Sequence, residues 1–115
     1  MTRALGEFEL LLLSAVLRLD DDAYGASVLR EIEVRTGREP AAGAVYTGLR
    51  RLEARGLLRS DIGEPTPERG GRRKRFFRLE PAGAEALASS LDSIRRIFAG
   101  LDDALEDALR QADGR

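Results

Sequence analysis

The residues best suited to chemistry lie between Arg69 and Arg78, where six of ten positions carry a positive charge. A solvated surface normally intersperses the two signs, so a cluster of one sign indicates a site for something negative. Arginine and lysine bind phosphate groups through charge-assisted hydrogen bonds. The alternative is a hairpin whose charges only keep it in solution, although solubility does not require a single sign.

The composition argues against enzyme chemistry. The 115 residues include no histidine and no cysteine, which removes the commonest general base, the commonest metal ligand, disulfides and thiolate metal sites. We therefore expect no catalytic residues, no metal and no cofactor. The sequence has neither the pattern of a signal peptide nor an apolar run of roughly 18 residues. The expected location is the cytoplasm, without a membrane partner.

The net charge of −1 conceals an asymmetry along the chain. Residues 35–78 hold 12 basic and 5 acidic side chains, a local charge of +7, whereas residues 81–115 hold 4 and 7, a local charge of −3. Nearly all the cations are arginines, whose planar fork of donors suits phosphates and guanine edges. A bias in genomic base composition would enrich arginine in the same way.

Apolar periodicity predicts a helix over residues 6–19. One stripe has the spacing of a helix face packed on a core: Phe8, Leu11, Leu12, Ala15, Val16 and Leu19. A second stripe comprises Leu10, Leu13 and Leu17. A helix that is apolar nearly all round must be covered on more than one side, so part of this helix is expected to meet another subunit.

Two further helices are predicted before the period changes. The first runs from about Tyr24 to Thr36, with residues 20–22 as acidic N-cap candidates and Gly37 as its end. The second runs over residues 42–55 after Pro40 and stops at Gly56. Its core-facing residues are Val45, Leu49 and Leu52.

A β-hairpin and a long helix complete the chain. Residues 57–62 and 75–79 are the predicted strands, joined by the Gly- and Pro-rich GEPTPERGGR, with Phe76 or Phe77 anchoring the second strand in the core. After Pro81 a heptad seam continues for about thirty residues, roughly 45 Å of helix. The seam comprises Leu87, Leu91, Ile94, Phe98, Leu101 and Leu105. The small domain cannot cover that length.

This order of elements predicts a mainly α fold with a small β-hairpin, namely a winged helix-turn-helix domain over residues 1–80. Residues 81–115 are the expected C-terminal dimerisation helix and a short tail. On the third helix, Gly43, Thr47, Arg50, Arg51 and Ala54 share the face opposite the core, and that face can enter a DNA major groove.

Each basic or polar residue of this surface has an expected role. Thr47 and Arg51 can reach base edges, Arg50 and Arg55 can reach phosphates, and the hairpin can contact the DNA backbone or the minor groove. The predicted DNA-binding residues are Gly43, Tyr46, Thr47, Arg50, Arg51, Arg55, Arg69, Arg72, Arg73 and Lys74.

Other interpretations stay open for several residues. Tyr46 fits a phosphate contact or a half-buried aromatic that closes the core. The helix arginines, Arg50, Arg51 and Arg55, also fit a solvated face that pairs with Glu53 or other acids. Gly43 and Gly48 each weaken a helix by roughly 0.5–1 kcal/mol. Their missing side chains would let DNA or a neighbouring helix approach closely, although Gly48 fits simple tolerance equally well.

Four segments, taken together, resemble the PadR family of bacterial transcriptional regulators: LGEFELLLLSAVLRL, DDAYGASVLREIEVRTGR, GAVYTGLRRLEARGLL and GEPTPERGGRRKRFFRLEPAGAEAL. The resemblance runs from about Leu5 to Leu87, and the short tail is similar to the compact branch of that family. It implies a homodimer in which the C-terminal helix of one subunit packs against the N-terminal and C-terminal helices of the other. The residues expected at that interface are Leu10, Leu13, Leu17, Leu87, Leu91, Ile94, Phe98, Leu101 and Leu105.

The leading interpretation is thus a sequence-specific regulator, a repressor, that binds double-stranded DNA as a homodimer. One alternative is a winged helix whose basic face meets an acidic protein. Another is a sensor in which a small-molecule effector binds between the long helices. Some compact relatives bind flat aromatic compounds between two tryptophans, but this chain has no tryptophan, so that mode does not transfer.

Overall fold

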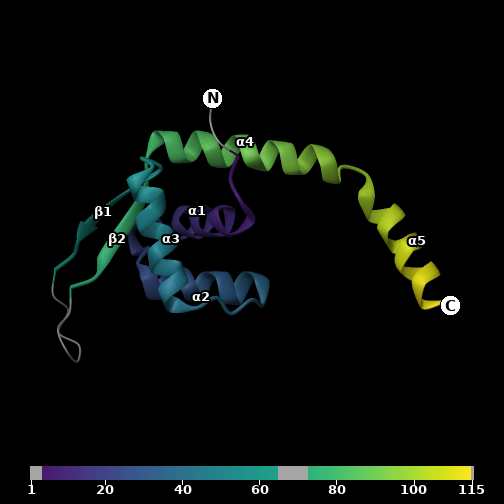
Figure 1. Ribbon diagram of the computed structural model, residues 1–115, viewed down its shortest axis with the longest axis horizontal. Coiled ribbons are helices and arrows are strands. Elements are labelled where there is room, and N and C mark those ends of the chain that lie inside the picture. Colours follow the sequence, from purple (N-terminus) through teal and green to yellow (C-terminus); the bar gives the residue numbers. More distant parts are fainter. Residues whose placement is uncertain (1–3, 65–72, 115) are drawn as a thin grey trace.

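The computed structural model describes residues 4–64 and 73–114, and it confirms a mainly helical fold with a two-stranded hairpin (Figure 1). The bounds of the elements are α1 Glu7–Leu19, the 3-10 helix η1 Asp20–Asp22, α2 Gly25–Thr36, α3 Ala42–Ala54, β1 Leu58–Ile62, β2 Arg75–Leu79, α4 Pro81–Phe98 and α5 Leu101–Asp113.

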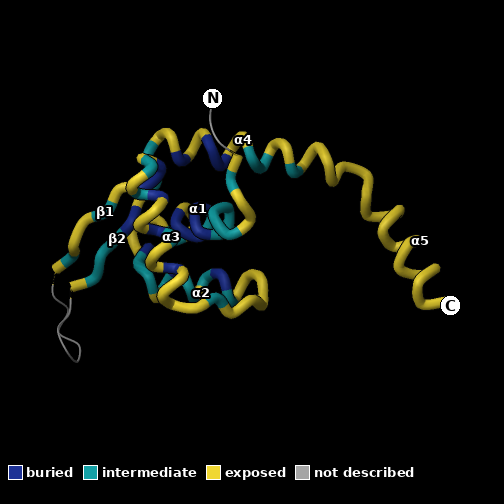
Figure 2. The backbone as a smooth tube through the Cα atoms, in the orientation of Figure 1, coloured by how far each residue is buried: buried dark blue, intermediate teal, exposed yellow. Residues whose placement is uncertain are grey.

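The hydrophobic core lies where α1, α2, α3, the hairpin and the start of α4 meet. Figure 2 shows the buried segments gathered there, whereas the end of α4 after Ile94 and all of α5 are exposed. The buried apolar residues are Leu12, Leu13, Ala15, Val16, Ala23, Val28, Ile32, Val45, Leu49, Leu52, Leu57, Leu58, Phe77, Ala86 and Leu87. The three predicted inward residues of α3 are among them.

Helix α1 is covered on several sides by its own chain, because it contacts α2, α3, β2 and α4. Leu13 is fully buried in this core, so its predicted place at a dimer interface is wrong. Leu87 is buried in the same core, so its predicted place at the interface is wrong for the same reason. The physical reason is that α4 folds back over α1 and covers part of its second apolar stripe. Leu10 stays half-buried, and Leu17 is 60% exposed.

The predicted helix ends are partly confirmed. Gly37 and Gly56 terminate α2 and α3 in the left-handed region, with φ of 74° and 79°. The aspartates before α2 are not its caps, because they form η1 instead. Ser27 caps α2 from within: its Oγ accepts a hydrogen bond from the Tyr24 backbone N–H at 2.9 Å and lies 2.6 Å from the Asp22 carbonyl oxygen.

The hairpin is antiparallel, with Leu58 opposite Leu79 and Ser60 opposite Phe77. Since side chains alternate along a strand, Phe77 points into the core while Phe76 lies on the other face. Phe77 is thus the predicted anchor. Its backbone N–H also donates to the Ala23 carbonyl at 2.8 Å, which fastens β2 to the segment that leads into α2.

The expected single C-terminal helix is two helices. Its heptad pattern continues through residue 100, but Ala99 and Gly100 leave the helical conformation and Gly100 has φ of 75°. Glycine adopts this left-handed conformation at little cost, so a turn forms there. Helix α4 is fixed at its start, where the Glu80 N–H donates to the Leu57 carbonyl at 3.0 Å. A Cβ on Gly83 would lie 2.0 Å from that carbonyl oxygen, so only glycine permits this approach.

Candidate nucleic-acid interface

Helix α3 presents one exposed face above a fully buried one. Val45, Leu49 and Leu52 hold it against the core. The residues on the opposite side that were predicted to face DNA are exposed: Gly43, Tyr46, Thr47, Arg50 and Arg51. A Cβ on Gly43 would meet no atom within 4 Å, so the first turn of α3 is open to a partner.

Tyr46 and Arg50 form one cluster on this face. Tyr46 is 45% exposed, which places it between the two interpretations of the sequence. The Arg50 guanidinium lies 6.0 Å from the centre of the Tyr46 ring, and its Nη1 is 3.4 Å from the Tyr46 hydroxyl. Arg50 Nε also lies 3.4 Å from a Glu53 carboxylate oxygen. These contacts are long and partly exposed, so Arg50 can turn toward a phosphate at little cost.

Arg55 forms an ion pair with α1. Its Nη1 lies 2.5 Å from Glu9 Oε2 on α1, and both side chains are about three-quarters covered. The ion pair joins the end of α3 to the start of α1. The predicted phosphate contact of Arg55 therefore has a structural competitor that lies 46 positions away in the sequence.

A polar chain connects α3 to both strands of the hairpin. Ser60 Oγ on β1 donates to Glu53 Oε2 at 2.5 Å, and Arg75 Nη1 on β2 donates to the same Ser60 oxygen at 2.9 Å. Sequence reasoning missed these three residues as a unit. The signal that was available is the alternation of β1, which places Ser60 on the face opposite its exposed neighbours. These two hydrogen bonds fix the hairpin relative to α3.

The cationic hairpin is described only in part. Arg69 and Arg72 lie outside the described residues. Arg73 is exposed, in agreement with its predicted role. Lys74 is different, because its ammonium group lies 4.2 Å from the centre of the Tyr24 ring, a cation–π contact.

The Tyr24 ring packs edge-on against Phe76, with ring centres 5.5 Å apart and planes at 72°. Lys74 is thus held at the base of the hairpin over the Tyr24 ring, which itself packs on Phe76.

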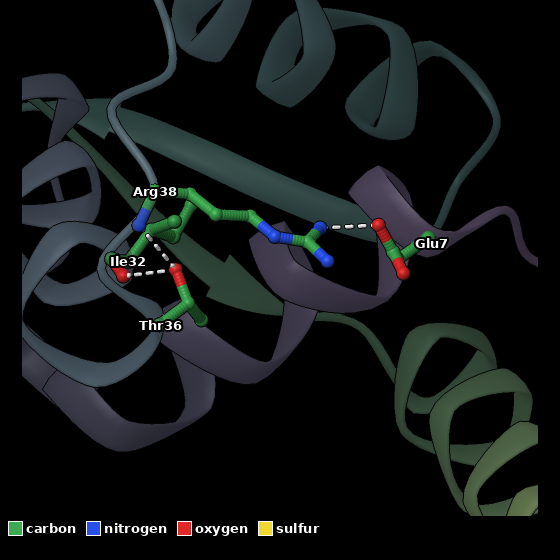
Figure 3. Close-up of polar contacts among 4 residues, drawn as sticks. All are labelled: Glu7, Ile32, Thr36 and Arg38. Atoms are coloured by element: carbon green, nitrogen blue, oxygen red, sulfur yellow. Dashed lines mark hydrogen bonds and ion pairs between the residues drawn. The ribbon is translucent and has the colours of Figure 1, made fainter. Parts of the chain in front are cut away.

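The turn between α2 and α3 is fixed by local hydrogen bonds (Figure 3). Thr36 Oγ1 lies 2.7 Å from the Ile32 carbonyl oxygen and accepts from the Arg38 N–H at 3.1 Å. Arg38 reaches across to pair with Glu7 at the start of α1. The hydrogen bond and the charge of Arg38 lower the pKa of the Glu7 carboxyl below its usual value. The turn that precedes α3 is thereby tied to α1.

Gly48 provides the close packing of α1 on α3. A Cβ there would lie 2.5 Å from Leu12 Cδ1 and 3.4 Å from Phe8 Cε2. Of the interpretations left open by the sequence, the approach of a neighbouring helix is therefore the one that holds.

Five of the residues predicted at a dimer interface lie in α4 and α5. Leu91 and Ile94 are half-buried, and Phe98, Leu101 and Leu105 are 60%, 44% and 58% exposed. Between the N-terminal segment and α4 lies a groove lined by Ala4, Leu5, Leu10, Ala86, Ser89, Ser90, Ser93 and Ile94. Leu10 and Ile94, expected to meet another subunit, thus border the same groove.

Two further properties bear on the site. Among the described residues, no group of three or more acidic side chains is placed to hold a metal ion. None of the described helices is long and apolar enough to cross a membrane.

Three helices followed by a hairpin, with an exposed cationic third helix, define a winged helix-turn-helix protein. The family described as "Transcriptional regulator PadR-like family" matches residues 12–89. The chain belongs to this family of DNA-binding transcriptional regulators.

Solved structures agree with this fold. The chain is similar to a PadR family transcription regulator from Clostridium difficile R20291, with a TM-score of 0.71 and 22% identity over 87% of this chain and 99% of that one. It is also similar to a PadR-like transcriptional regulator from Bacillus cereus, with a TM-score of 0.69 and 15% identity over 85% and 90%. It is similar as well to a PadR family transcriptional regulator from Eggerthella lenta, with a TM-score of 0.63 and 24% identity over 84% of this chain and 81% of that one. No curated protein matches the chain.

Proposed function

We propose that this regulator is a sequence-specific repressor that binds, as a homodimer, an inverted-repeat operator in double-stranded DNA. The observation that carries the proposal is the face of α3, where exposed polar and cationic side chains stand directly above three buried core residues. A rigid helix that displays such a face is suited to the major groove.

The residues of this face divide by reach and chemistry. Thr47 and Arg51 lie one turn apart, and Arg51 has no ion-pair partner among the described residues. In the proposed complex Arg51 donates two hydrogen bonds to a guanine edge, while Thr47 contacts a neighbouring base. Tyr46 and Arg50 bind phosphates, and Gly43 lets the DNA backbone come close.

The hairpin supplies the second contact. Arg73 and Lys74, together with Arg69 and Arg72, bind the sugar-phosphate backbone or enter the minor groove. The hydrogen bonds from Glu53 through Ser60 to Arg75 support a second contact by the hairpin, because they keep it in a fixed position relative to α3. Arg55 plays a smaller part than the sequence indicated, since Glu9 holds its guanidinium.

Dimerisation gives the operator its symmetry. Two recognition helices fit successive major grooves when they are about 34 Å apart, so residues 81–115 of two subunits must hold them at that spacing. We assign this role to the half-buried Leu91 and Ile94 of α4, to Leu10 of α1, and to the exposed Leu17, Phe98, Leu101 and Leu105. Repression then follows from occupancy of promoter DNA.

Selection of bound duplexes from a random pool tests the proposal. The expected result is an inverted repeat whose half-sites lie about 10 base pairs apart, centre to centre. A reporter gene with that sequence in its promoter should fall in expression when the protein is present. An enriched single half-site would contradict the dimer, and a pool without enrichment would contradict sequence-specific binding.

A further inference from the structure

Three arginines lie in the strands of the hairpin, and two of them are paired with acids. Arg59 Nη1 lies 3.1 Å from a Glu80 carboxylate oxygen, and Arg78 Nη2 lies 3.3 Å from Asp20 Oδ1. Arg75 forms no ion pair with any residue that the structure describes. Within that part of the chain its guanidinium donates one hydrogen bond, to the serine hydroxyl of β1. The positive charge of Arg75 is therefore left without an anion.

The three arginines also differ in the face of the hairpin that they occupy. Arg59 and Arg78 lie directly opposite each other, and neighbouring residues along a strand alternate between the two faces. Arg75 is three positions from Arg78, so it lies on the other face, which it shares with Ser60. Ser60 donates to Glu53 of α3, so this face is turned toward α3, which runs beside the hairpin (Figure 1).

The environment of Arg75 suits a phosphate. Arg75 is half-buried, and an unpaired charge costs more free energy when it is withdrawn from water. A guanidinium has five N–H donors in a planar fork, and Ser60 accepts from one nitrogen, Nη1. The remaining donors are free to hold a phosphate through two parallel hydrogen bonds.

Glu53 holds a second arginine at the same junction of α3 and the hairpin. One of its carboxylate oxygens lies 3.4 Å from Arg50 Nε, and the other accepts from Ser60 Oγ at 2.5 Å. The Glu53 side chain is only 25% exposed, so it is placed between these partners rather than in solvent. Two guanidiniums and one carboxylate give the group a charge of +1, which one phosphate neutralises.

We propose that Arg75 binds a phosphate of the DNA backbone at the junction of α3 and the hairpin, next to the phosphate contact of Arg50, and that Ser60 and Glu53 position its guanidinium. This inference rests on the proposed function, in which the exposed face of α3 enters the major groove. Because Arg50 and Arg75 belong to different elements and are linked to one carboxylate, their contacts hold the helix and the hairpin on the same stretch of backbone.

Two variants of β2 form a matched pair for the test. Arg75→Gln and Arg78→Gln each remove one positive charge from the same strand, and the glutamine amide at position 75 still donates to Ser60. The full-length proteins are titrated into a fluorescein-labelled duplex of mixed sequence, because every duplex offers phosphates. Fluorescence anisotropy gives the dissociation constant at several salt concentrations, and the urea midpoint reports whether each variant folds.

Arg75→Gln should weaken binding by about three- to tenfold and flatten the slope of log affinity against log salt by about 0.9, the value for one phosphate. Arg78→Gln should change the slope much less, since Asp20 holds Arg78 on the other face. An unchanged slope for Arg75→Gln would overturn the inference even if affinity fell, because the loss would then be structural. Equal flattening by both variants would also overturn it, because net charge alone would explain the effect.

Two further variants distinguish a phosphate contact from a structural role. Arg75→Lys keeps the charge and should retain the salt slope, since an ammonium also binds phosphate. A slope as flat as that of Arg75→Gln would contradict the contact. Ser60→Ala changes no charge but removes the hydroxyl that positions Arg75, so Arg75→Gln should cost at least about twofold less affinity in that background than in the wild type. An equal cost in both backgrounds would show that Ser60 does not position Arg75.

The same titrations separate this inference from the proposed function. If the wild-type protein binds the duplex with a steep salt dependence and Arg75→Gln leaves the slope unchanged, the Arg75 contact is wrong and the proposed function stands. If the wild-type protein binds no duplex at low salt, both fail.

Discussion

Residues 7–87 and residues 88–113 are both rich in helix, yet they differ in what covers their apolar side chains. The fifteen buried apolar residues all lie between Leu12 and Leu87. Beyond Leu87, Ile97, Phe98 and Leu105 are each more than half exposed. The first region is folded by its own core, whereas the second presents apolar surface for a partner. In the proposed function, the first region reads DNA and the second sets the spacing of two such regions in a dimer.

The largest effect is expected where the second region meets the partner. Ile94→Asp would place a carboxylate in an apolar interface, a cost incurred twice in a symmetric dimer. We expect the dimer dissociation constant to rise by more than about a thousandfold, with loss of operator binding. Sedimentation and a gel shift measure both. Arg96→Asp, on the opposite side of α4, is the matched control. A stable Ile94→Asp dimer with normal operator affinity would remove α4 from the interface.

Periodicity was sufficient to predict the first region. The stripes of α1 and α3, the glycines at positions 37 and 56 and the alternation of the hairpin all act within a few residues, so local rules identify them. The same rules predicted that Phe76 or Phe77 would lie in the core, and Phe77 is the one that does. Gly48 stayed undecided, because its role depends on Leu12 of a helix more than thirty positions earlier.

The errors at Leu13 and Leu87 share one cause, which is that a sequence pattern identifies an apolar side chain but not its partner. Leu13 and Leu87 lie on stripes that suit an interface, but α4 of the same chain packs on α1 and buries them. For Arg55 the sequence left a phosphate contact and an acidic partner both open, and it could not identify Glu9 of α1 as that partner. The heptad pattern did not predict the turn at Gly100, because a glycine permits both a continuous helix and a left-handed turn.

A pair of phenylalanines tests the comparison directly. Phe77 is fully buried and Phe98 is 60% exposed. Phe77→Ala should lower the free energy of unfolding by about 3–5 kcal/mol, because it leaves a cavity at the base of the hairpin. Phe98→Ala should change that free energy by an amount that depends on protein concentration, since the proposed contacts of Phe98 lie in the dimer. Urea titrations at two concentrations distinguish these outcomes. A concentration-independent loss of similar size for both variants would contradict the division.

Within the first region, specificity should concentrate on one arginine. Arg51→Ala should reduce discrimination at one base pair per half-site by about 1–3 kcal/mol while non-specific binding stays nearly intact. Arg73→Ala is the contrasting variant, because a phosphate contact weakens binding to every duplex alike and lowers the salt slope by about one. Binding to single-base operator variants at several salt concentrations measures both. A uniform loss for Arg51→Ala would move Arg51 to the phosphate-binding class.

The turn between α4 and α5 is the next point at which the second region can be changed. Gly100 has φ of 75° and no atom within 4 Å of where a Cβ would lie, so only its backbone conformation resists substitution. Gly100→Ala should favour a continuous helix by about 2 kcal/mol, from the left-handed penalty and the higher helix propensity of alanine. The dimer dissociation constant, measured by sedimentation, should then rise. Gly100→Asn, which tolerates the left-handed region, should raise it less. Equal constants for both variants would show that the turn does not position α5 in the dimer.

The smallest effect is expected from the ion pair that ties the turn before α3 to α1. Arg38 lowers the pKa of Glu7 in the folded protein below its value of 4.5 in the absence of a partner. A carboxyl with a depressed pKa contributes stability that is present above the unfolded pKa and is lost as the pH falls through the folded pKa. Because Glu7 is fully exposed, solvent screens the pair and the contribution is small. Glu7→Gln should therefore flatten the fall in the urea midpoint below about pH 4.5 only slightly. Asp103→Asn in α5, where no described residue forms an ion pair with Asp103, should leave the profile unchanged. A larger change for Asp103→Asn than for Glu7→Gln would show that stability at acid pH depends on residues 88–113. That result would contradict the division between a region folded by its own core and a region whose apolar side chains its own chain leaves exposed.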